Sequence, residues 1–446
     1  MPNKVDLNSD YPAIDKSNEL YEKALDLIPA TTQTLAKGPQ QNIKGIAPKY
    51  LAKGKGSHVW DVDGNEYIDY NMGIGPLSLG YAYPAVDEAI KKQLEDGITF
   101  SLMHPLEVEV AELIHEIIPN AESVRYSKTG ADVTSAAVRV ARAYTGKDKV
   151  LCCGYHGWHD WYISVTDKNK GIPKSIADLT FTFNYNDIQS VKDSLDPDVG
   201  TIILEPFVFQ PPENNFLHDL RKLCDDEGIV LIFDEMWTGF RVALGGAQEY
   251  FGIKADLATF SKAVANGMPI SILTGKKEIM KLLDNDVFFY TTFGGEALSL
   301  AAAKATINEL RDKNVPKYLA EKGKILKDGY NNIASGLGMD YTKCIGYDFR
   351  SLMTFDEKAG NPRELKSLVQ QEMIKRGILW GGFHNMSYSH TDDDINYTLK
   401  VYKEVLPILK KAVDENDVKG YLRGEPVEPV FRKVSNFNTK PKQKSV

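Results

Sequence analysis

An acid and a lysine stand at two points where buried strands are expected to end. Residues 229–233 are a short apolar run rich in β-branched side chains, which predicts a strand buried on both faces of a parallel sheet, and Asp234 follows it. A second apolar piece, residues 257–260, precedes Lys262. Because ligands bind beyond the carboxyl ends of strands in open α/β sheets, both side chains are expected at the mouth of one site. This pairing suits a pyridoxal phosphate (PLP) enzyme, in which the lysine forms a Schiff base and the acid pairs with the pyridinium nitrogen.

The same spacing is also compatible with a protein that has no such site. Strands often end in aspartate, and most lysines are solvated. The rest of the chain has to decide between the two interpretations.

Two further segments could complete a cofactor site. Residues 128–132 (KTGAD) form a tight turn between an expected strand and an expected helix, 133–144, and a helix N-terminus offers free backbone N–H groups to an anion. Residues 154–161 (GYHGWHDW) follow an expected buried strand and offer aromatic rings on which a flat ligand could stack. An ordinary strand–helix turn and a hydrophobic cluster under a loop remain open as alternatives.

Composition is that of a soluble globular protein with more than one domain. The 446 residues exceed one ordinary core, and 43% are hydrophobic and 26% charged. Lys and Arg total 53 against 61 Asp and Glu, a net charge of −8, which disfavours nucleic acid as a partner. No apolar run suits a membrane span and no apolar leader opens the chain, so we expect a cytoplasmic protein. The four cysteines form no CxxC pair, and we expect reduced thiols and no metal site.

The order of expected elements predicts the architecture that positions these residues. From about residue 84, helices and strands alternate, which predicts an α/β fold with a mostly parallel sheet between helices. Residues 46–80 are expected to form a small β-meander, and the pattern after about residue 320 indicates a separate α+β domain. We expect an N-terminal segment, a large PLP-binding domain, a small C-terminal domain and a tail, with these bounds: 1–80, 81–318, 319–420 and 421–446.

Several motifs occur together in an order that is highly specific. They are residues 60–69 (WDVDGNEYID), 129–131 (TGA), 155–157 (YHG), 205–206 (EP), 234–235 (DE) with 238–241 (TGFR), 261–262 (SK) and 292–295 (TFGG). On these motifs the chain resembles the class III PLP-dependent aminotransferases of fold type I, and most closely their glutamate-1-semialdehyde aminomutase group, over about residues 20–415. The resemblance implies a large domain with a seven-stranded sheet and a smaller domain built from both ends of the chain.

The resemblance also implies roles for individual residues. Lys262 would carry PLP as a Schiff base and then act as general base, and Asp234 would keep the ring nitrogen protonated. Tyr155 would stack on the ring, and the turn at Thr129, Gly130 and Ala131 would bind the phosphate. Thr292 would reach the phosphate of a partner subunit, which implies a homodimer with shared active sites.

The sequence determines less well the roles of three candidate substrate contacts and of one histidine. Glu205 occupies the family's Glu-Pro position, where it either contacts the substrate or caps a loop. We assign His156, beside Tyr155, to the cofactor site, and leave open whether His156 and His159 contact substrate or only pack. Lys37 stands where aminomutases carry an arginine for the substrate carboxylate, and lysine lacks that bidentate fork. The C-terminal segment 381–390 has no arginine but has His384, which we expect near the substrate.

These departures favour an aminotransferase that acts on a polyol, sugar or sugar-acid ketone or aldehyde, with glutamate as the expected amino donor. The alternative within the family is an aminomutase, which shifts an amino group within one molecule. Decay to a non-enzymatic PLP-binding protein is disfavoured because Lys262, Asp234 and Tyr155 are all present. A nicotinamide dehydrogenase is disfavoured because no GxGxxG opens the first strand.

Overall fold

The computed structural model describes residues 11–428, which form two compact units. The larger unit comprises residues 84–317, and the smaller unit comprises residues 11–83 together with 318–428. The tail expected over residues 421–446 lies outside the described residues from position 429 onward. No described helix has the length and apolar character that crossing a membrane requires.

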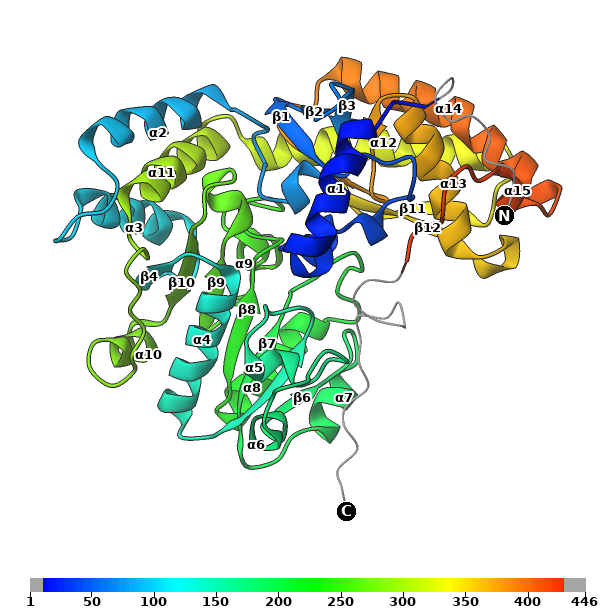
Figure 1. Cartoon of the computed structure of the whole chain (residues 1–446). Coiled ribbons are helices and arrows are strands. Elements are labelled where there is room, and N and C mark those ends of the chain that lie inside the picture. Colours follow the sequence, from blue (N-terminus) through cyan, green and yellow to red (C-terminus); the bar gives the residue numbers. More distant parts are fainter. Residues whose placement is uncertain (1–10, 429–446) are drawn as a thin grey trace. The chain divides into compact units, whose positions relative to one another are not determined.

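The larger unit is organised around a seven-stranded sheet with the strand order β4-β10-β9-β8-β7-β5-β6 (Figure 1). The strands are β4 Ser123–Ser127, β5 Lys149–Cys153, β6 Thr180–Thr182, β7 Val199–Leu204, β8 Val230–Asp234, β9 Leu257–Phe260 and β10 Ser271–Gly275. Strands β5 to β9 pair in parallel, whereas β10 is antiparallel to both of its neighbours. The prediction of a mostly parallel seven-stranded sheet is therefore confirmed.

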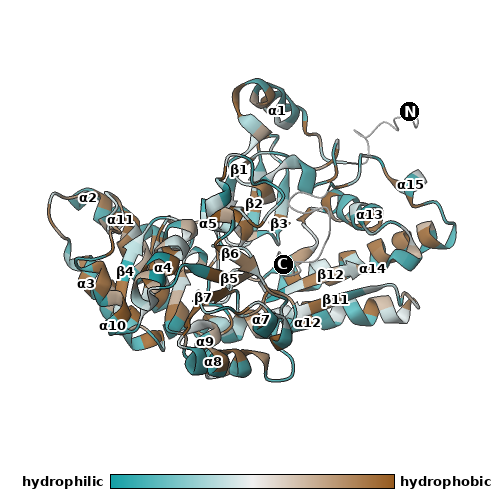
Figure 2. Ribbon diagram, turned by 90° about the horizontal axis from the view of Figure 1, so that it is seen from below, coloured by the Kyte–Doolittle hydropathy of each residue, from teal (hydrophilic) through white to brown (hydrophobic). Residues whose placement is uncertain are grey.

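Helices alternate with these strands along the chain. They are α2 Pro84–Asp96, α3 Pro105–Ile117, α4 Gly130–Thr145, α5 Asp160–Ile163, α6 Lys174–Ala177, α7 Ile188–Asp193, α8 Phe216–Glu227, α9 Gly246–Phe251, α10 Lys277–Met280 and α11 Ala297–Asp312. Two 3-10 turns, η6 Lys262–Ala265 and η7 Lys281–Leu283, complete the unit. Figure 2 shows the central strands coloured as hydrophobic, while the outer helices carry both hydrophobic and hydrophilic residues. This is the pattern of a sheet buried between amphipathic helices.

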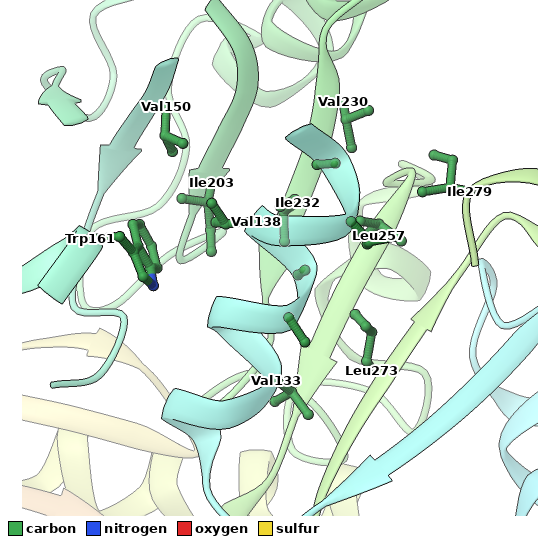
Figure 3. Packing of buried hydrophobic residues seen from close by; sticks show 14 of the residues in the cluster. Val133, Val138, Val150, Trp161, Ile203, Val230, Ile232, Leu257, Leu273 and Ile279 are labelled. Atoms are coloured by element: carbon green, nitrogen blue, oxygen red, sulfur yellow. The ribbon is translucent and has the colours of Figure 1, made fainter. Parts of the chain in front are cut away.

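Helix α4 forms the core on one face of this sheet. Its buried side chains pack with alternate strand residues, which point to one face because the side-chain period of a strand is two (Figure 3). The cluster includes Val133 and Val138 of α4 with Ile203, Ile232 and Leu257 of three neighbouring strands. Each fully buried side chain of this kind contributes about 1.5–3 kcal/mol to stability. The N-terminus of α4 is thereby held at a fixed position on the sheet.

The smaller unit joins both ends of the chain. One sheet has the order β1-β2-β3-β13 and the other β11-β12-β14. The strands are β1 Leu51–Lys55, β2 His58–Asp61, β3 Glu66–Asp69, β11 Thr342–Tyr347, β12 Arg350–Phe355, β13 Ile378–Leu379 and β14 Phe383–Asn385. The helices are α1 Asp15–Leu27, α12 Val315–Gly336, α13 Pro362–Lys375, α14 Asp392–Asp414 and α15 Val418–Tyr421, with 3-10 turns at Pro29–Thr31, Leu35–Lys37, Pro39–Gln41, Met72–Ile74 and Glu357–Ala359. The parallel pairing of β13 with β3 joins the two chain segments in one sheet.

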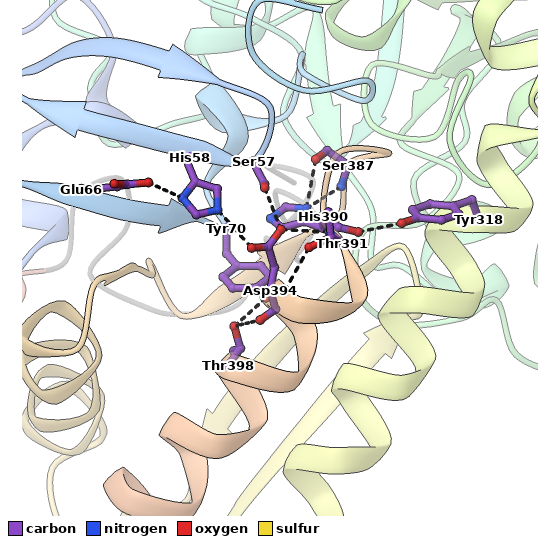
Figure 4. A network of polar contacts seen from close by, with 10 residues as sticks. All are labelled: Ser57, His58, Glu66, Tyr70, Tyr318, Ser387, His390, Thr391, Asp394 and Thr398. Atoms are coloured by element: carbon purple, nitrogen blue, oxygen red, sulfur yellow. Dashed lines mark hydrogen bonds and ion pairs between the residues drawn. The ribbon is translucent and has the colours of Figure 1, made fainter.

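A polar network at the start of α14 ties the N-terminal strands to the C-terminal helix (Figure 4). The Asp394 carboxylate accepts hydrogen bonds from the Ser57 hydroxyl at 2.8 Å and from the Thr391 backbone N–H at 2.9 Å, and it pairs with His58 Nε2 at 3.0 Å. These contacts hold the pKa of Asp394 well below its usual range, although burial opposes them. The hydrogen bond to Asp394 likewise raises the pKa of His58.

Replacing Asp394 with alanine is expected to lower the free energy of unfolding by about 2–3 kcal/mol at pH 7, because it removes one side of the capping box with Thr391 and leaves buried donors unpaired. Since the folded-state pKa of Asp394 lies below the unfolded value near 4, its contribution is present at neutral pH and is lost only as the pH falls below about 4. Urea unfolding at a series of pH values measures both effects. Asp393, its exposed neighbour, is the control, and an equal loss in Asp393→Ala would contradict the assignment.

Candidate active site

Asp234 and Lys262 lie at the same edge of the large sheet. Asp234 is the last residue of β8 and pairs in parallel register with Thr259 of β9, and Lys262 follows β9 as the first residue of the 3-10 turn η6. Lys262 has a positive φ of 44°, an uncommon conformation for a residue with a side chain. Parallel strands end at one edge, so the spacing predicted from the sequence brings the acid and the lysine to one site.

The carboxylate of Asp234 is buried and has two partners. Its Oδ2 atom is 2.8 Å from His156 Nδ1, and its Oδ1 atom accepts a hydrogen bond from the Met236 backbone N–H at 3.1 Å. The other ring nitrogen of His156 is 3.1 Å from the carbonyl oxygen of Cys153. Both ring nitrogens of His156 therefore face oxygen atoms, one of a side chain and one of the backbone. His156 therefore fixes the carboxylate of Asp234.

Glu205 holds the loop that carries Tyr155. It follows β7, and its Oε2 atom accepts a hydrogen bond from the Tyr155 backbone N–H at 2.9 Å. Gly154, with a φ of +112°, allows this approach, because a Cβ atom there would lie 2.7 Å from the same oxygen. Burial, together with the neighbouring charge of Asp234, raises the pKa of Glu205. The contact agrees with the structural alternative for Glu205, a carboxylate that holds a loop.

The ring of Tyr155 remains accessible although its backbone is fixed. Its side chain is 47% exposed, and its ring meets Tyr162 edge-on with centroids 5.6 Å apart. The exposed part of the ring offers a surface for a flat ligand at the strand edge. His159, in the same loop, contacts Ser135 Oγ through Nδ1 at 2.6 Å.

The turn before α4 can hold an anion. Thr129 and Asp132 form a capping box, in which the Thr129 N–H donates to Asp132 Oδ2 at 2.8 Å and the Asp132 N–H donates to Thr129 Oγ1 at 3.3 Å. Among the described residues this leaves the N–H groups of Gly130 and Ala131 without partners. The turn lies beside the site, because a Cβ atom on Gly130 would meet the Met236 sulfur at 2.9 Å. Free N–H groups and the helix dipole together favour a phosphate here.

These residues fit the chemistry of PLP. A lysine, a buried acid with a histidine behind it, an open aromatic ring and a helix N-terminus match the aldehyde, ring nitrogen, ring face and phosphate of that cofactor. In the described part of the chain, no group of three or more His, Cys, Asp or Glu residues is placed to hold a metal ion.

Thr292 lies on the loop before α11 and is exposed. That loop is anchored by Glu296, which caps α11 through the Leu298 N–H at 2.7 Å and pairs with Lys128 Nζ at 2.6 Å. The hydrogen bonds and the ion pair lower the pKa of Glu296 against the effect of burial. Glu296 thus has a local structural role.

Lys37 and His384 belong to the smaller unit. Lys37 lines a cavity of about 420 Å³ there, together with Lys49, Asp69, Asn71 and Tyr81 among others. Burial raises the pKa of Asp69 to about 6, although the Tyr81 hydroxyl donates to its carboxylate at 2.7 Å.

The structure places His384, which we expected near the substrate, in the core of the smaller unit. Its side chain is fully buried, and its ring nitrogens contact Ser351 Oγ at 3.0 Å and the Tyr402 hydroxyl at 2.7 Å. Burial lowers the pKa of His384 to about 3, so it stays neutral. With both nitrogens occupied in the core, His384 has no atom to offer a ligand.

Two residues near Lys262 did not enter the predicted site. The Lys262 Nζ atom lies 3.9 Å from the ring centroid of Trp237, and the guanidinium carbon of Arg241 lies 5.6 Å from the same ring. Arg241 is buried, its Nε and Nη2 atoms have no partner in the described part of the chain, and burial lowers its pKa to about 9. In the sequence, these two residues could have been found from their position in the segment that directly follows Asp234.

Comparison with known proteins gives a consistent result. Residues 42–345 match the family described as aminotransferase class-III. The chain is 35% identical over 413 residues to 3-aminobutyryl-CoA aminotransferase of Cloacimonas acidaminovorans, covering 89% of this chain and 98% of the relative. It is 38% identical over 426 residues to glutamate-1-semialdehyde 2,1-aminomutase of Chlorobium phaeobacteroides, covering 87% and 97%.

A solved structure shares the fold. The FumI protein of Sphingopyxis sp. MTA144, determined with PLP, superposes with a TM-score of 0.83 at 27% identity and covers 89% of this chain and 97% of its own. The architecture predicted from the sequence, PLP fold type I, is thereby confirmed.

Proposed function

Because this chain belongs to the class-III aminotransferase family and is a PLP-dependent enzyme, we propose that it transfers an amino group from glutamate to a ketone or aldehyde of a polyol, sugar or sugar acid. The relatives of this chain include both an aminotransferase and an aminomutase. The proposal concerns which of the two reactions is catalysed and on what substrate.

The larger unit would supply the chemistry. PLP, when bound, provides an electron sink that stabilises a carbanion at the substrate carbon. In our proposal the Nζ atom of Lys262 holds the cofactor and then moves a proton to and from that carbon. Asp234, fixed by His156, keeps a proton on the ring nitrogen. Tyr155 covers the ring, and the N–H groups of Gly130 and Ala131 hold the phosphate.

The observation that carries the substrate proposal is the cavity in the smaller unit. Its lining includes Lys37 and Lys49 and three amide side chains, Gln41, Asn42 and Asn71, and no arginine among the described residues that line it. Amides bind hydroxyl groups well, and a lysine binds an acidic group as a point charge without the bidentate fork of arginine. This lining supports a hydroxylated carbonyl compound as the amino acceptor.

A homodimer with shared active sites is part of the proposal. Large apolar side chains of the larger unit are strongly exposed, among them Leu102 (79%), Met103 (82%) and Phe288 (72%). In our proposal these side chains are covered by the partner chain. Thr292, exposed on its own chain, would then reach the phosphate bound by the partner. Light scattering in solution, with the mass of two chains as the expected result, tests this step.

Glutamate alone is expected to react with the purified enzyme and to release the cofactor from Lys262. The visible absorbance of the lysine-bound cofactor should disappear, and one equivalent of 2-oxoglutarate should form per active site, because a transaminase completes this half-reaction without an acceptor. An acceptor search among sugar ketones and aldehydes would then follow.

An unchanged spectrum with glutamate would contradict glutamate as the donor. The aminomutase alternative is favoured by the relatives that carry that name, and it would be supported if a semialdehyde substrate were turned over with no release of 2-oxoglutarate. The two outcomes separate the transaminase from the aminomutase.

A further inference from the structure

Trp237 lies directly against the amine of Lys262. It stands three residues after Asp234, where the chain leaves β8, and its ring centroid is 3.9 Å from Lys262 Nζ. An ammonium within about 6 Å of an indole face is attracted by the ring quadrupole, and indole is the strongest of the aromatic acceptors. The contact joins two segments that follow neighbouring parallel strands.

Charged groups also surround this contact, and the charge of Lys262 acts on Glu205, whose pKa it lowers against the effect of burial. Asp234 is bound to His156 and to the Met236 N–H, and Glu205 accepts the Tyr155 N–H. The only other cation of the segment, Arg241, also faces the Trp237 ring, with its guanidinium carbon 5.6 Å from the centroid. Arg241 would repel an ammonium on Lys262, and the indole ring between the two cations offsets part of that repulsion.

We propose that Trp237 is a positioning residue for Lys262, whose indole face holds the ε-ammonium whenever that amine is not bonded to the cofactor. The inference rests on the role proposed for Lys262 and on no choice of substrate. The ring stabilises the charged amine and not the neutral one, so it keeps the released lysine protonated and in one place.

This arrangement has a kinetic consequence. The lysine can attach to PLP only as the neutral amine, whose nitrogen bonds to the aldehyde carbon as water leaves. The proton lost beforehand from the ammonium passes to solvent. Removing the aromatic face should therefore make attachment faster at neutral pH, because more of the amine is neutral. A variant that keeps an aromatic ring should behave like the wild type.

Attachment of PLP to the full-length apoenzyme tests the proposal. The visible absorbance of the lysine-bound cofactor is followed after mixing at a series of pH values. For Trp237→Leu, attachment near pH 7 should be about five- to tenfold faster, and the pH of half-maximal rate should fall by up to about one unit. Trp237→Phe should retain most of the wild-type pH profile. Trp60→Leu is the matched control, because Trp60 contacts Lys53 at 4.6 Å in the smaller unit.

Different outcomes would contradict the role of Trp237 and the role of Lys262. An unshifted profile in Trp237→Leu, or an equal shift in Trp237→Phe, would overturn the proposal, since ring size and not the aromatic face would then matter. The site of attachment is read by borohydride reduction and mass spectrometry. Attachment to a residue other than Lys262 would instead overturn the catalytic assignment, and with it the inference. Circular dichroism verifies that each variant is folded.

Discussion

Replacing Lys262 with alanine is expected to reduce kcat with glutamate by at least about 10⁴-fold. Loss of a general base alone typically costs about 10²–10⁴-fold, and the variant also loses the amine that attaches to the cofactor. The position of Lys262 at the end of β9, one strand from Asp234, allows one amine to serve both purposes. Formation of 2-oxoglutarate in single turnover measures the loss, and the absence of the visible absorbance of lysine-bound PLP confirms its cause.

Lys254 provides the matched control for this variant. It is exposed, lies eight residues before Lys262, and its replacement by alanine should leave turnover unchanged. If Lys262→Ala reacted at the wild-type rate while Lys254→Ala did not, the assignment of the attaching lysine would be wrong.

Replacing Asp234 with asparagine should lower kcat by about 10²–10³-fold, the range found when one preorganised electrostatic contact is removed from an active site. The amide cannot hold a proton on the ring nitrogen as a carboxylate does, so the cofactor becomes a weaker electron sink. The change is nearly isosteric, and the Met236 N–H can still donate to the side-chain oxygen. The contact to His156 at 2.8 Å is altered, because that ring loses its anionic partner.

Two measurements separate this catalytic effect from a folding defect. Urea unfolding compares the stability of Asp234→Asn with that of the wild type, and equilibrium binding of PLP shows that the cofactor still enters. Asp226→Asn, at an exposed position on α8, is the control and should retain full activity. Full turnover by Asp234→Asn would refute the proposed role of this carboxylate.

Much of the fold followed from local patterns. Helix α14, over residues 392–414, is marked in the sequence by the Thr391 cap that begins it and by apolar positions at helical spacing. Strands β2 and β3 form a hairpin within the β-meander expected over residues 46–80, since the Asp63-Gly64 dipeptide between them favours a tight turn. Each of these features depends on neighbours in the sequence and can therefore be predicted from it.

Non-local pairings were less accessible. Strand β10 was not predicted, and it is antiparallel to both neighbours although the chain around it alternates strands and helices. Its place in the sheet depends on β4, which precedes it by more than 140 residues. No pattern within a single segment encodes such a partner.

The amino-acid sequence by itself determined which groups this protein can use: an acid and a lysine after two buried strands, a capped helix start after a third, and an aromatic loop. Only the tertiary structure decided how they are used. It paired Asp234 with His156, placed Trp237 on Lys262, and enclosed His384 in the core of the smaller unit. The physical reason is that strand ends are marked by local apolar runs, whereas the side chain that meets a given atom depends on packing between segments distant in sequence.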